Sequence, residues 1–128
     1  MSRPQVEFFR LSPQFVVPDV KRSAEYYRDK YGFEIDGYFM DPPIYAIVSR
    51  GGASIHFGKS DDGSVKTNDL VRKHSCLDAY ILISDVIGMH DELKSRGANI
   101  IEGPVERPYG RIEITVQDED GFYLVFGE

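Results

Sequence analysis

The stretch Val17-Pro18-Asp19-Val20 is matched 66 residues later by Ile83-Ser84-Asp85-Val86. Each stretch begins at the end of an apolar run that is rich in β-forming residues. An aspartate follows the run, and a helical pattern begins directly after the aspartate. An internal repeat of this length indicates two similar modules. A module of about sixty residues is too small to bury a good core alone. The sequence therefore predicts two modules that share one core.

Each repeat predicts one helix with a defined start and end. The first helix is expected over residues 20–31, with Asp19 as its N-terminal cap and Gly32 as its left-handed stop. The second helix is expected over residues 86–96, where an aspartate and a glycine flank the pattern in the same way. Apolar residues recur at spacings of three and four along both segments, so each helix is expected to bury one face.

The other apolar segments are typical of strands, because their side chains alternate between two faces. Each module is therefore expected to be β-α-β-β-β. The expected strands are Ser12–Val17, Gly37–Met40, Ile44–Ser49, Ala53–Gly58, Asp78–Ile83, Asn99–Ile101, Arg111–Val116 and Phe122–Phe126.

The chain is expected to form one α+β domain over residues 1–128. The first module covers residues 8–58 and the second covers residues 76–128. Residues 59–75 are polar, contain Asp61-Asp62-Gly63 and show little periodicity. This segment is long for a connection, so it is either a linker or a flap over a site.

Charge and cysteine content limit the classes of partner. Fifteen Lys and Arg stand against 21 Asp and Glu, for a net charge of -6. This balance argues against nucleic acid or an anionic membrane as the main partner and leaves neutral or cationic small molecules open. The longest apolar run, residues 79–83, is far too short to span a bilayer. One cysteine and the lack of a secretory segment lead us to expect a protein of the reducing cytoplasm.

One face of the expected sheets does not have the composition of a plain solvent face. Opposite the apolar positions, the strands carry polar, aromatic and aliphatic residues together, with few lysines. This mixture suits a concave ligand surface, and it equally suits a sheet face covered by a second subunit. The candidate ligand-binding residues are His56, Asp78, Tyr80, Tyr109, Arg111, Glu113 and Tyr123.

Each candidate has an alternative role. His56 can donate to or accept from a ligand, or be hydrogen-bonded to a neighbouring strand. Asp78 and Glu113 can hold a cationic group, or form a charge pair with Arg111. The three tyrosines can stack on a flat or cationic ligand, or cover an interface.

Both ends of the chain carry a series of short motifs. These are Phe15–Val20, Ala24–Asp29, Tyr31–Glu34, Pro108–Gly110, Val116–Gly121 and Leu124–Glu128. In this order, with the repeat between them, they resemble the signatures of the vicinal oxygen chelate superfamily, which includes glyoxalases, bleomycin-resistance proteins and extradiol dioxygenases. The resemblance covers nearly the whole chain and implies paired β-α-β-β-β modules that form an open, curled, mixed sheet around a cleft.

The resemblance also implies four positions that hold a divalent metal in the enzymes of the superfamily. Here these positions fall on Ser12, His56, Asp78 and Val125, with Gln14 replacing Ser12 if the first strand is shifted by two residues. Serine is a poor ligand for such metals and valine is none, whereas catalytic sites need about three protein ligands. We therefore expect neither a metal nor another cofactor.

The chain is thus most similar to the metal-free bleomycin-resistance branch. This similarity implies a homodimer that binds or sequesters a small aromatic or cationic molecule without turnover. The alternative is a metal-dependent or metal-free enzyme of the same superfamily, of the lyase, isomerase or dioxygenase kind, acting on a small metabolite.

Overall fold

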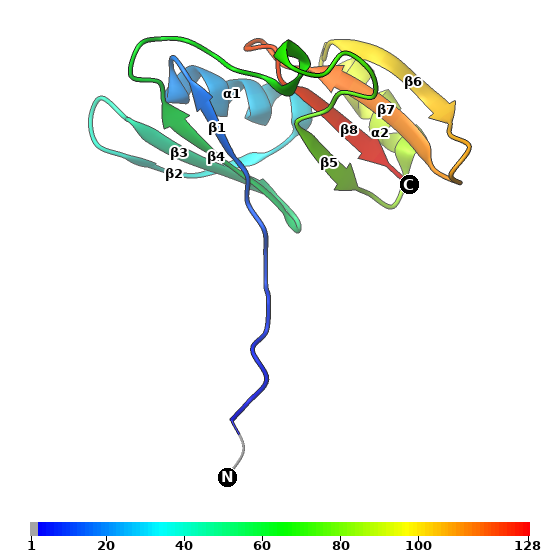
Figure 1. Ribbon diagram of the computed structural model, residues 1–128, viewed down its shortest axis with the longest axis horizontal. Helices are drawn as coiled ribbons and strands as arrows, with labels where there is room; N and C mark the ends of the chain where they lie inside the picture. The colour runs from blue at the N-terminus through cyan, green and yellow to red at the C-terminus, as the bar shows by residue number, and fades with distance from the viewer. Residues whose placement is uncertain (1–2) are drawn as a thin grey trace.

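A computed structural model describes residues 3–128, and these form two β-α-β-β-β units (Figure 1). The first unit consists of β1 (Gln14–Val17), α1 (Val20–Tyr31), β2 (Glu34–Phe39), β3 (Tyr45–Arg50) and β4 (Ala53–Lys59). A short 3-10 helix, η1 (Asn68–Leu70), lies in the connection. The second unit consists of β5 (Ala79–Leu82), α2 (Val86–Ser95), β6 (Ile100–Glu106), β7 (Ile112–Gln117) and β8 (Tyr123–Gly127).

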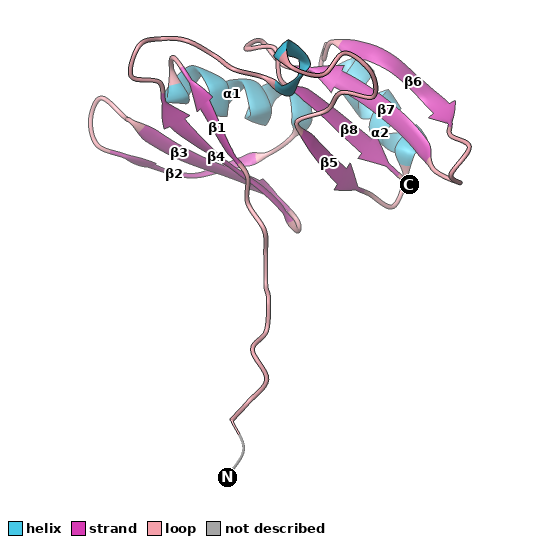
Figure 2. Cartoon of the chain, viewed as in Figure 1, coloured by secondary structure: helices cyan, strands magenta, loops and turns pink. Residues whose placement is uncertain are grey.

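Each unit has its own four-stranded mixed sheet. The strand orders are β1-β4-β3-β2 and β5-β8-β7-β6, so the two units have the same topology. The first strand of each unit runs parallel to the last, and the other pairs are antiparallel. One helix accompanies each open sheet (Figure 2). The predicted α+β fold of tandem modules is confirmed.

The helices begin and end where their capping residues require. The Asp19 carboxylate accepts a hydrogen bond from the Arg22 amide at 3.1 Å, and Gly32 ends α1 in the left-handed region at φ 73°. Asp85 caps α2 in the same way, at 2.9 Å from the Gly88 amide. α1 has the expected limits, and α2 ends one residue earlier than expected.

The two units share one hydrophobic core. Phe15 of β1 stacks on Phe122, next to β8, with ring centroids 4.2 Å apart. The Tyr27 hydroxyl of α1 donates to the buried carboxylate of Asp118, beyond β7, at 2.7 Å. Ser23 of α1 donates to Asp120 at 2.7 Å. Contacts of this kind explain why neither unit needs a complete core of its own.

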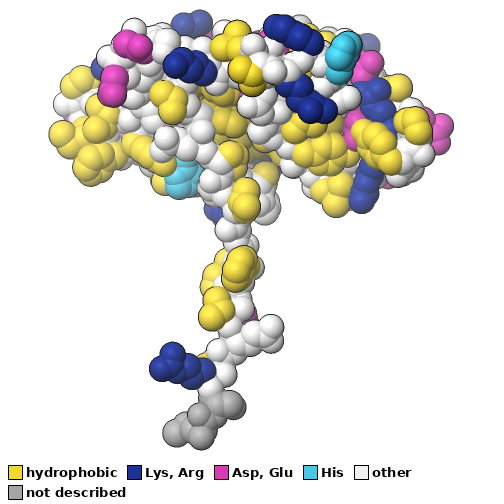
Figure 3. Space-filling model, viewed as in Figure 1, with side chains coloured by type: hydrophobic (Ala, Val, Ile, Leu, Met, Phe, Trp, Pro, Cys, Tyr) yellow, Lys and Arg dark blue, Asp and Glu magenta, His cyan; other side chains and the backbone are white. Residues whose placement is uncertain are grey.

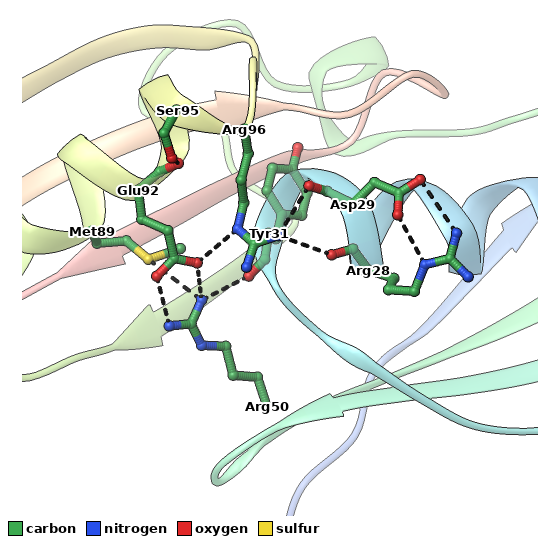
Figure 4. Close-up of polar contacts among 8 residues, drawn as sticks. All are labelled: Arg28, Asp29, Tyr31, Arg50, Met89, Glu92, Ser95 and Arg96. Atoms are coloured by element: carbon green, nitrogen blue, oxygen red, sulfur yellow. Dashed lines mark hydrogen bonds and ion pairs between the residues drawn. The ribbon is translucent and has the colours of Figure 1, made fainter.

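An ion-pair cluster fastens α2 to the first unit (Figure 4). Both terminal nitrogens of Arg50 donate to Glu92, at 2.7 and 3.0 Å, and Arg50 also donates to the Tyr31 carbonyl at 2.9 Å. Arg96 donates to Glu92 at 2.9 Å and to the Asp29 carbonyl at 3.2 Å. The cluster therefore satisfies carbonyls at the end of α1 as well as a carboxylate on α2.

Glu92→Gln is expected to lower the free energy of unfolding at pH 7 by about 1 kcal/mol, because the bridge is partly exposed and screened by solvent. The hydrogen bond from Arg50 holds the pKa of Glu92 below its usual range. A lowered carboxyl pKa gives stability that is present at neutral pH and is lost as the pH falls through the folded-state pKa. Urea titrations at pH 7 and at pH 3 measure the difference. A Glu92→Gln effect that is as large at pH 3 as at pH 7 would contradict this assignment.

β6 departs most from the expected limits. The sequence predicted a short strand over residues 99–101, whereas β6 extends to Glu106 and includes Pro104. Proline has no N–H to give to a ladder, which argues against a central strand. β6 is an edge strand with register shifts in its pairing with β7, and an edge tolerates proline.

Candidate functional site

The outer face of the second sheet, turned away from its helix, is organised around Glu113 of β7. Its side chain is 3% exposed. The hydroxyls of Tyr80 and Tyr109 both donate to its Oε2 atom at 2.7 Å. The Arg107 Nε atom donates to Oε1 at 3.0 Å. Three donors on one carboxylate make a pre-organised polar centre on a face that also carries aromatic and aliphatic side chains.

The network fixes the protonation of its members. Burial opposes ionisation of Glu113, but hydrogen bonds from Tyr109, Tyr80 and Arg107 outweigh it and hold its pKa below the usual range. Burial and the bond to Glu113 raise the pKa of Tyr80 to about 12. The hydrogen bond to Glu113 also raises the pKa of Tyr109. At neutral pH the centre is therefore a carboxylate held by two neutral phenols and one guanidinium.

A cavity of about 850 Å³ opens over this centre. Tyr109 and Tyr123 supply aromatic surface, and Thr115 and Val125 form part of its floor. Its rim includes Lys73 and Cys76 from the connection between the units, together with the ion pair between Arg107 and Glu102. The cavity is thus aromatic and aliphatic with a few charged groups, the usual composition of a small-molecule site.

Asp78 lies beside this face but is occupied by backbone groups. Its two carboxylate oxygens accept from the Asn68 amide and the Tyr123 amide, both at 2.9 Å. The side chain therefore joins the connection between the units to the start of β8. In the single chain this carboxylate fixes local structure.

Arg111 does not form the charge pair that the sequence offered as an alternative. It lies in the exposed turn before β7, and Arg107 occupies the position beside Glu113. The turn explains the difference, because the Arg107 amide donates to the Arg111 carbonyl at 2.7 Å and the chain folds back over β7. Sequence patterns do not identify Arg107, because its contact with Glu113 depends on this turn and not on strand alternation.

His56 lies on the outer face of the first sheet and does not line the cavity at Glu113. Its Nδ1 atom and the Tyr45 hydroxyl are 2.7 Å apart. Gln14 donates to the same hydroxyl oxygen at 3.2 Å, so Gln14 of β1, Tyr45 of β3 and His56 of β4 form one hydrogen-bonded chain. The alternative of a histidine bonded to a neighbouring strand is the one found within a single chain.

Comparison with known proteins gives the family. The family model of the glyoxalase/bleomycin resistance protein/dioxygenase superfamily matches residues 10–126. The chain belongs to this superfamily. No protein with a curated description matches the chain in a sequence comparison.

Several solved structures share the fold over nearly the whole chain. TioX from Micromonospora sp. ML1 has a TM-score of 0.74 at 19% identity, covering 93% of this chain and 97% of its own. A bleomycin-binding protein complexed with bleomycin has a TM-score of 0.72 at 18% identity, with coverages of 93% and 97%. A glyoxalase-related enzyme from Clostridium phytofermentans has a TM-score of 0.74 at 18% identity, with coverages of 99% and 98%. Identities this low show the fold alone.

Strand pairing shows which residues lie side by side near the four positions that the resemblance implies for a metal. Gln14 lies opposite His56 in the first unit, and Tyr80 lies opposite Val125 at the equivalent place in the second. Ser12 and Asp78 each precede these strand partners by two residues.

The implied positions do not fit a divalent metal. Ser12, His56, Asp78 and Val125 provide two common ligands, and Gln14 in place of Ser12 adds none, where a catalytic site needs about three. Within residues 3–128, no three His, Cys, Asp or Glu side chains gather closely enough to hold an ion.

No helix within residues 3–128 combines the length and the apolar character that a membrane crossing requires.

Proposed function

We propose that this protein binds and sequesters a small planar molecule, neutral or cationic, in the cavity over Glu113, without a metal. The observation that carries the proposal is the buried Glu113 carboxylate, held by three donors in a cavity that Tyr109 and Tyr123 also line. Aromatic rings offer stacking surface and attract cations, and a fixed carboxylate adds a negative potential in the same cavity. The fold shared with a bleomycin-binding protein agrees with this role.

The same network favours binding over turnover. A general base works best when its pKa lies near the operating pH. The pKa of Glu113 lies below its usual range and the pKa of Tyr80 is about 12, so neither group exchanges a proton readily at neutral pH. Both oxygens of Glu113 are also engaged by protein donors. These features support sequestration, and we propose that the protein acts in this way in the cytoplasm, as a protein of the antibiotic-resistance type.

We also propose that the binding unit is a homodimer. In one chain the outer faces of both sheets are uncovered, and large apolar side chains such as Val16 and Leu82 are exposed there. A second copy can cover the first sheet with the second sheet of its partner. His56 of one chain then faces the cavity over Glu113 of the other, which unites the candidates that a single chain keeps apart.

Calorimetric titration tests binding, with bleomycin, the planar cation proflavine and a planar anion of similar size as probes. We expect proflavine or bleomycin to bind and the anion to bind more weakly. The recovered probe is then analysed by mass spectrometry. Recovery of chemically altered probe at many turnovers per subunit would establish the enzyme alternative. Tight binding of the anion alone would overturn the electrostatic argument.

Sedimentation velocity tests the assembly, and we expect a dimer at micromolar concentration. A monomer at that concentration would refute the homodimer.

Asp78→Asn is expected to lower the free energy of unfolding by about 1–2 kcal/mol, because the two backbone amides lose a charged acceptor and one of them then faces an NH2 group that cannot accept. Proflavine affinity is expected to change less than threefold, since this carboxylate is already occupied. Urea denaturation and calorimetry measure the two quantities. A large loss of affinity with unchanged stability would instead place Asp78 in contact with the ligand.

A further inference from the structure

Arg107 lies between two carboxylates at the cavity over Glu113. Its Nε atom donates to Glu113 Oε1 at 3.0 Å, and one of its terminal nitrogens donates to Glu102. Glu113 is buried, whereas the Glu102 side chain is half exposed. All three side chains line the cavity. The guanidinium of Arg107 therefore joins a buried carboxylate to a solvated one at the rim.

The ion pair between Arg107 and Glu113 changes what the cavity offers to a ligand. A carboxylate and a guanidinium in contact largely cancel each other's field at a distance, so a cation gains the full attraction of Glu113 only where the pair is opened. A buried carboxylate that loses its counter-charge is strongly destabilising. The group that replaces Arg107 at Glu113 must therefore be a cation as well.

The other two donors to Glu113 are less suited to exchange. The hydroxyls of Tyr80 and Tyr109 are neutral, and each donates to Oε2 at 2.7 Å. If a cationic ligand displaced one of these phenols, Arg107 would still neutralise the carboxylate and the charge of the ligand would remain without a partner. Exchange at Oε1, where Arg107 donates, replaces one cation by another and keeps the charges balanced.

The side chain of Arg107 can leave Glu113 while the turn that carries it stays in place. Backbone bonds fix this turn, from the Arg107 amide to the Arg111 carbonyl at 2.7 Å and from the Gly110 amide to the Arg107 carbonyl at 3.0 Å. Rotation about the long side chain gives up the bond to Glu113 and keeps the pair with Glu102 at the rim. In the space-filling view, charged side chains of both signs lie close together among hydrophobic ones over β6 and β7 (Figure 3).

We propose that the guanidinium of Arg107 occupies the position that the cationic group of the ligand takes, and that the ligand is a planar cation with N–H donors, of the amidinium or guanidinium class. The proposal rests on the function proposed above. A planar amidinium supplies both features of the displaced group, a positive charge and an N–H that points at a carboxylate oxygen. Arg107 is then the residue that determines specificity, because a ligand must replace both features to reach Glu113.

This requirement distinguishes between classes of cation. A quaternary ammonium carries the charge but has no N–H, so it would leave Glu113 Oε1 without the donor that Arg107 now supplies. A neutral amide has the N–H but not the charge. Proflavine, a planar cation with amino groups, belongs to the predicted class. The rings of Tyr109 and Tyr123 line the same cavity and offer aromatic surface to the flat part of such a ligand.

Calorimetry on the wild-type protein tests the class of ligand with three probes of similar size, namely benzamidine, phenyltrimethylammonium and the neutral benzamide. We expect benzamidine to bind about tenfold more tightly than either of the others, because only benzamidine supplies both the charge and the donor. Equal affinities for benzamidine and phenyltrimethylammonium would overturn the proposal.

Arg107→Met tests the displacement, because methionine keeps the aliphatic stem and removes the competing cation. We expect benzamidine affinity to rise about tenfold, since the ligand no longer has to break a charge-assisted hydrogen bond. Arg111→Met is the matched control, because it removes the same charge at the other end of the turn without touching Glu113, and less than about a threefold change is expected. Unchanged or weaker binding by Arg107→Met, or equal gains in the two variants, would overturn the proposal.

Nuclear magnetic resonance observes Arg107 directly and needs no variant. The Nε–H of Arg107 in the ¹⁵N-labelled wild-type protein is expected to be protected from exchange with solvent by its bond to the buried Glu113. Saturation with benzamidine should shift this resonance and speed its hydrogen exchange by about tenfold or more, because the bond is then broken. A resonance that stays protected while calorimetry shows bound benzamidine would overturn the proposal.

The outcomes separate this inference from the proposed function. Proflavine binding with no preference for benzamidine, and with Arg107 still protected, overturns the inference and leaves the function standing. Displacement of Arg107 by benzamidine that is recovered chemically altered after many turnovers supports the inference and overturns sequestration. Failure of both proflavine and benzamidine to bind, to the wild type and to Arg107→Met, overturns both.

Discussion

Glu113→Gln is expected to reduce proflavine affinity by about 10- to 100-fold, the largest effect of any single substitution in the site. The substitution removes the negative charge to which the Tyr109 hydroxyl donates, in the cavity that Tyr123 also lines. It also replaces one acceptor oxygen by an amide nitrogen, which cannot accept the hydrogen bonds that the carboxylate receives. The phenols then lose their fixed orientation, so both the charge and the stacking surface are affected. Calorimetry at pH 7 measures the change.

Glu102→Gln provides the matched control. Glu102 pairs with the same Arg107 and loses the same charge, but its side chain is half exposed at the rim of the cavity. Solvent screens such a charge, so we expect less than a threefold loss. Equal losses from the two substitutions would show that only the total charge near the cavity matters. No loss from Glu113→Gln would remove Glu113 from the site.

Strand alternation was sufficient to group the polar and aromatic side chains on the outer face of the second sheet. Tyr80, Glu113 and Tyr123 were assigned to one side of their strands, and the hydrogen bonds and cavity place them on one outer face. The alternation has a period of two, so a shift of two residues leaves every side chain on the same face. For this reason the pattern could not distinguish Ser12 from Gln14 as the residue opposite His56. Only the strand pairing distinguishes them.

Contacts made by turns were beyond the reach of the sequence pattern. Arg107 and Arg111 flank the same turn, and composition alone gives no reason to prefer either as the partner of Glu113. The bond from the Arg107 amide to the Arg111 carbonyl sets the course of the chain and brings Arg107 over β7. The capping residues of α1, in contrast, are local signals, and they defined both ends of that helix in advance.

The relation between the two units also could not be derived from their repeat. The repeat predicts two similar modules but says nothing of the surface through which they meet. In the structure that surface includes α1 and the turn between β7 and β8, where Tyr27 and Asp118 form a buried hydrogen bond. The importance of Asp118 was therefore hidden in the sequence, where it forms part of an ordinary polar turn.

Asp118→Ala is expected to lower the free energy of unfolding by about 3 kcal/mol at pH 7, the largest effect on stability that we predict. The side chain accepts from the amides of Asp120 and Phe122, both at 2.9 Å, and from the Tyr27 hydroxyl. Alanine leaves all three donors without this acceptor at the junction of the two units. Tyr27→Phe removes one donor and keeps the acceptor, so about 1 kcal/mol is expected. Urea denaturation measures both, and an equal loss in the two variants would contradict the assignment.

The pH dependence of stability provides an independent test at the same position. Burial raises the pKa of Asp118 to about 6, so the folded protein binds this proton more tightly than the unfolded chain. The contribution of Asp118 to the free energy of unfolding therefore increases as the pH falls from 7 to 4, by about 2–3 kcal/mol. The contributions of Glu92 and Glu113 to the free energy of unfolding change in the opposite direction, because their pKa values are lowered and their contributions are lost in acid.

Asp118→Asn isolates the contribution of Asp118, because asparagine keeps an acceptor oxygen and cannot ionise. The free energy of unfolding of this variant, measured in urea, is subtracted from that of the wild type at each pH. The contributions of the other carboxylates are the same in both proteins and cancel in this difference. The difference should grow between pH 7 and pH 4 in favour of the wild type, and a difference that is flat over this range would show that Asp118 has an ordinary pKa.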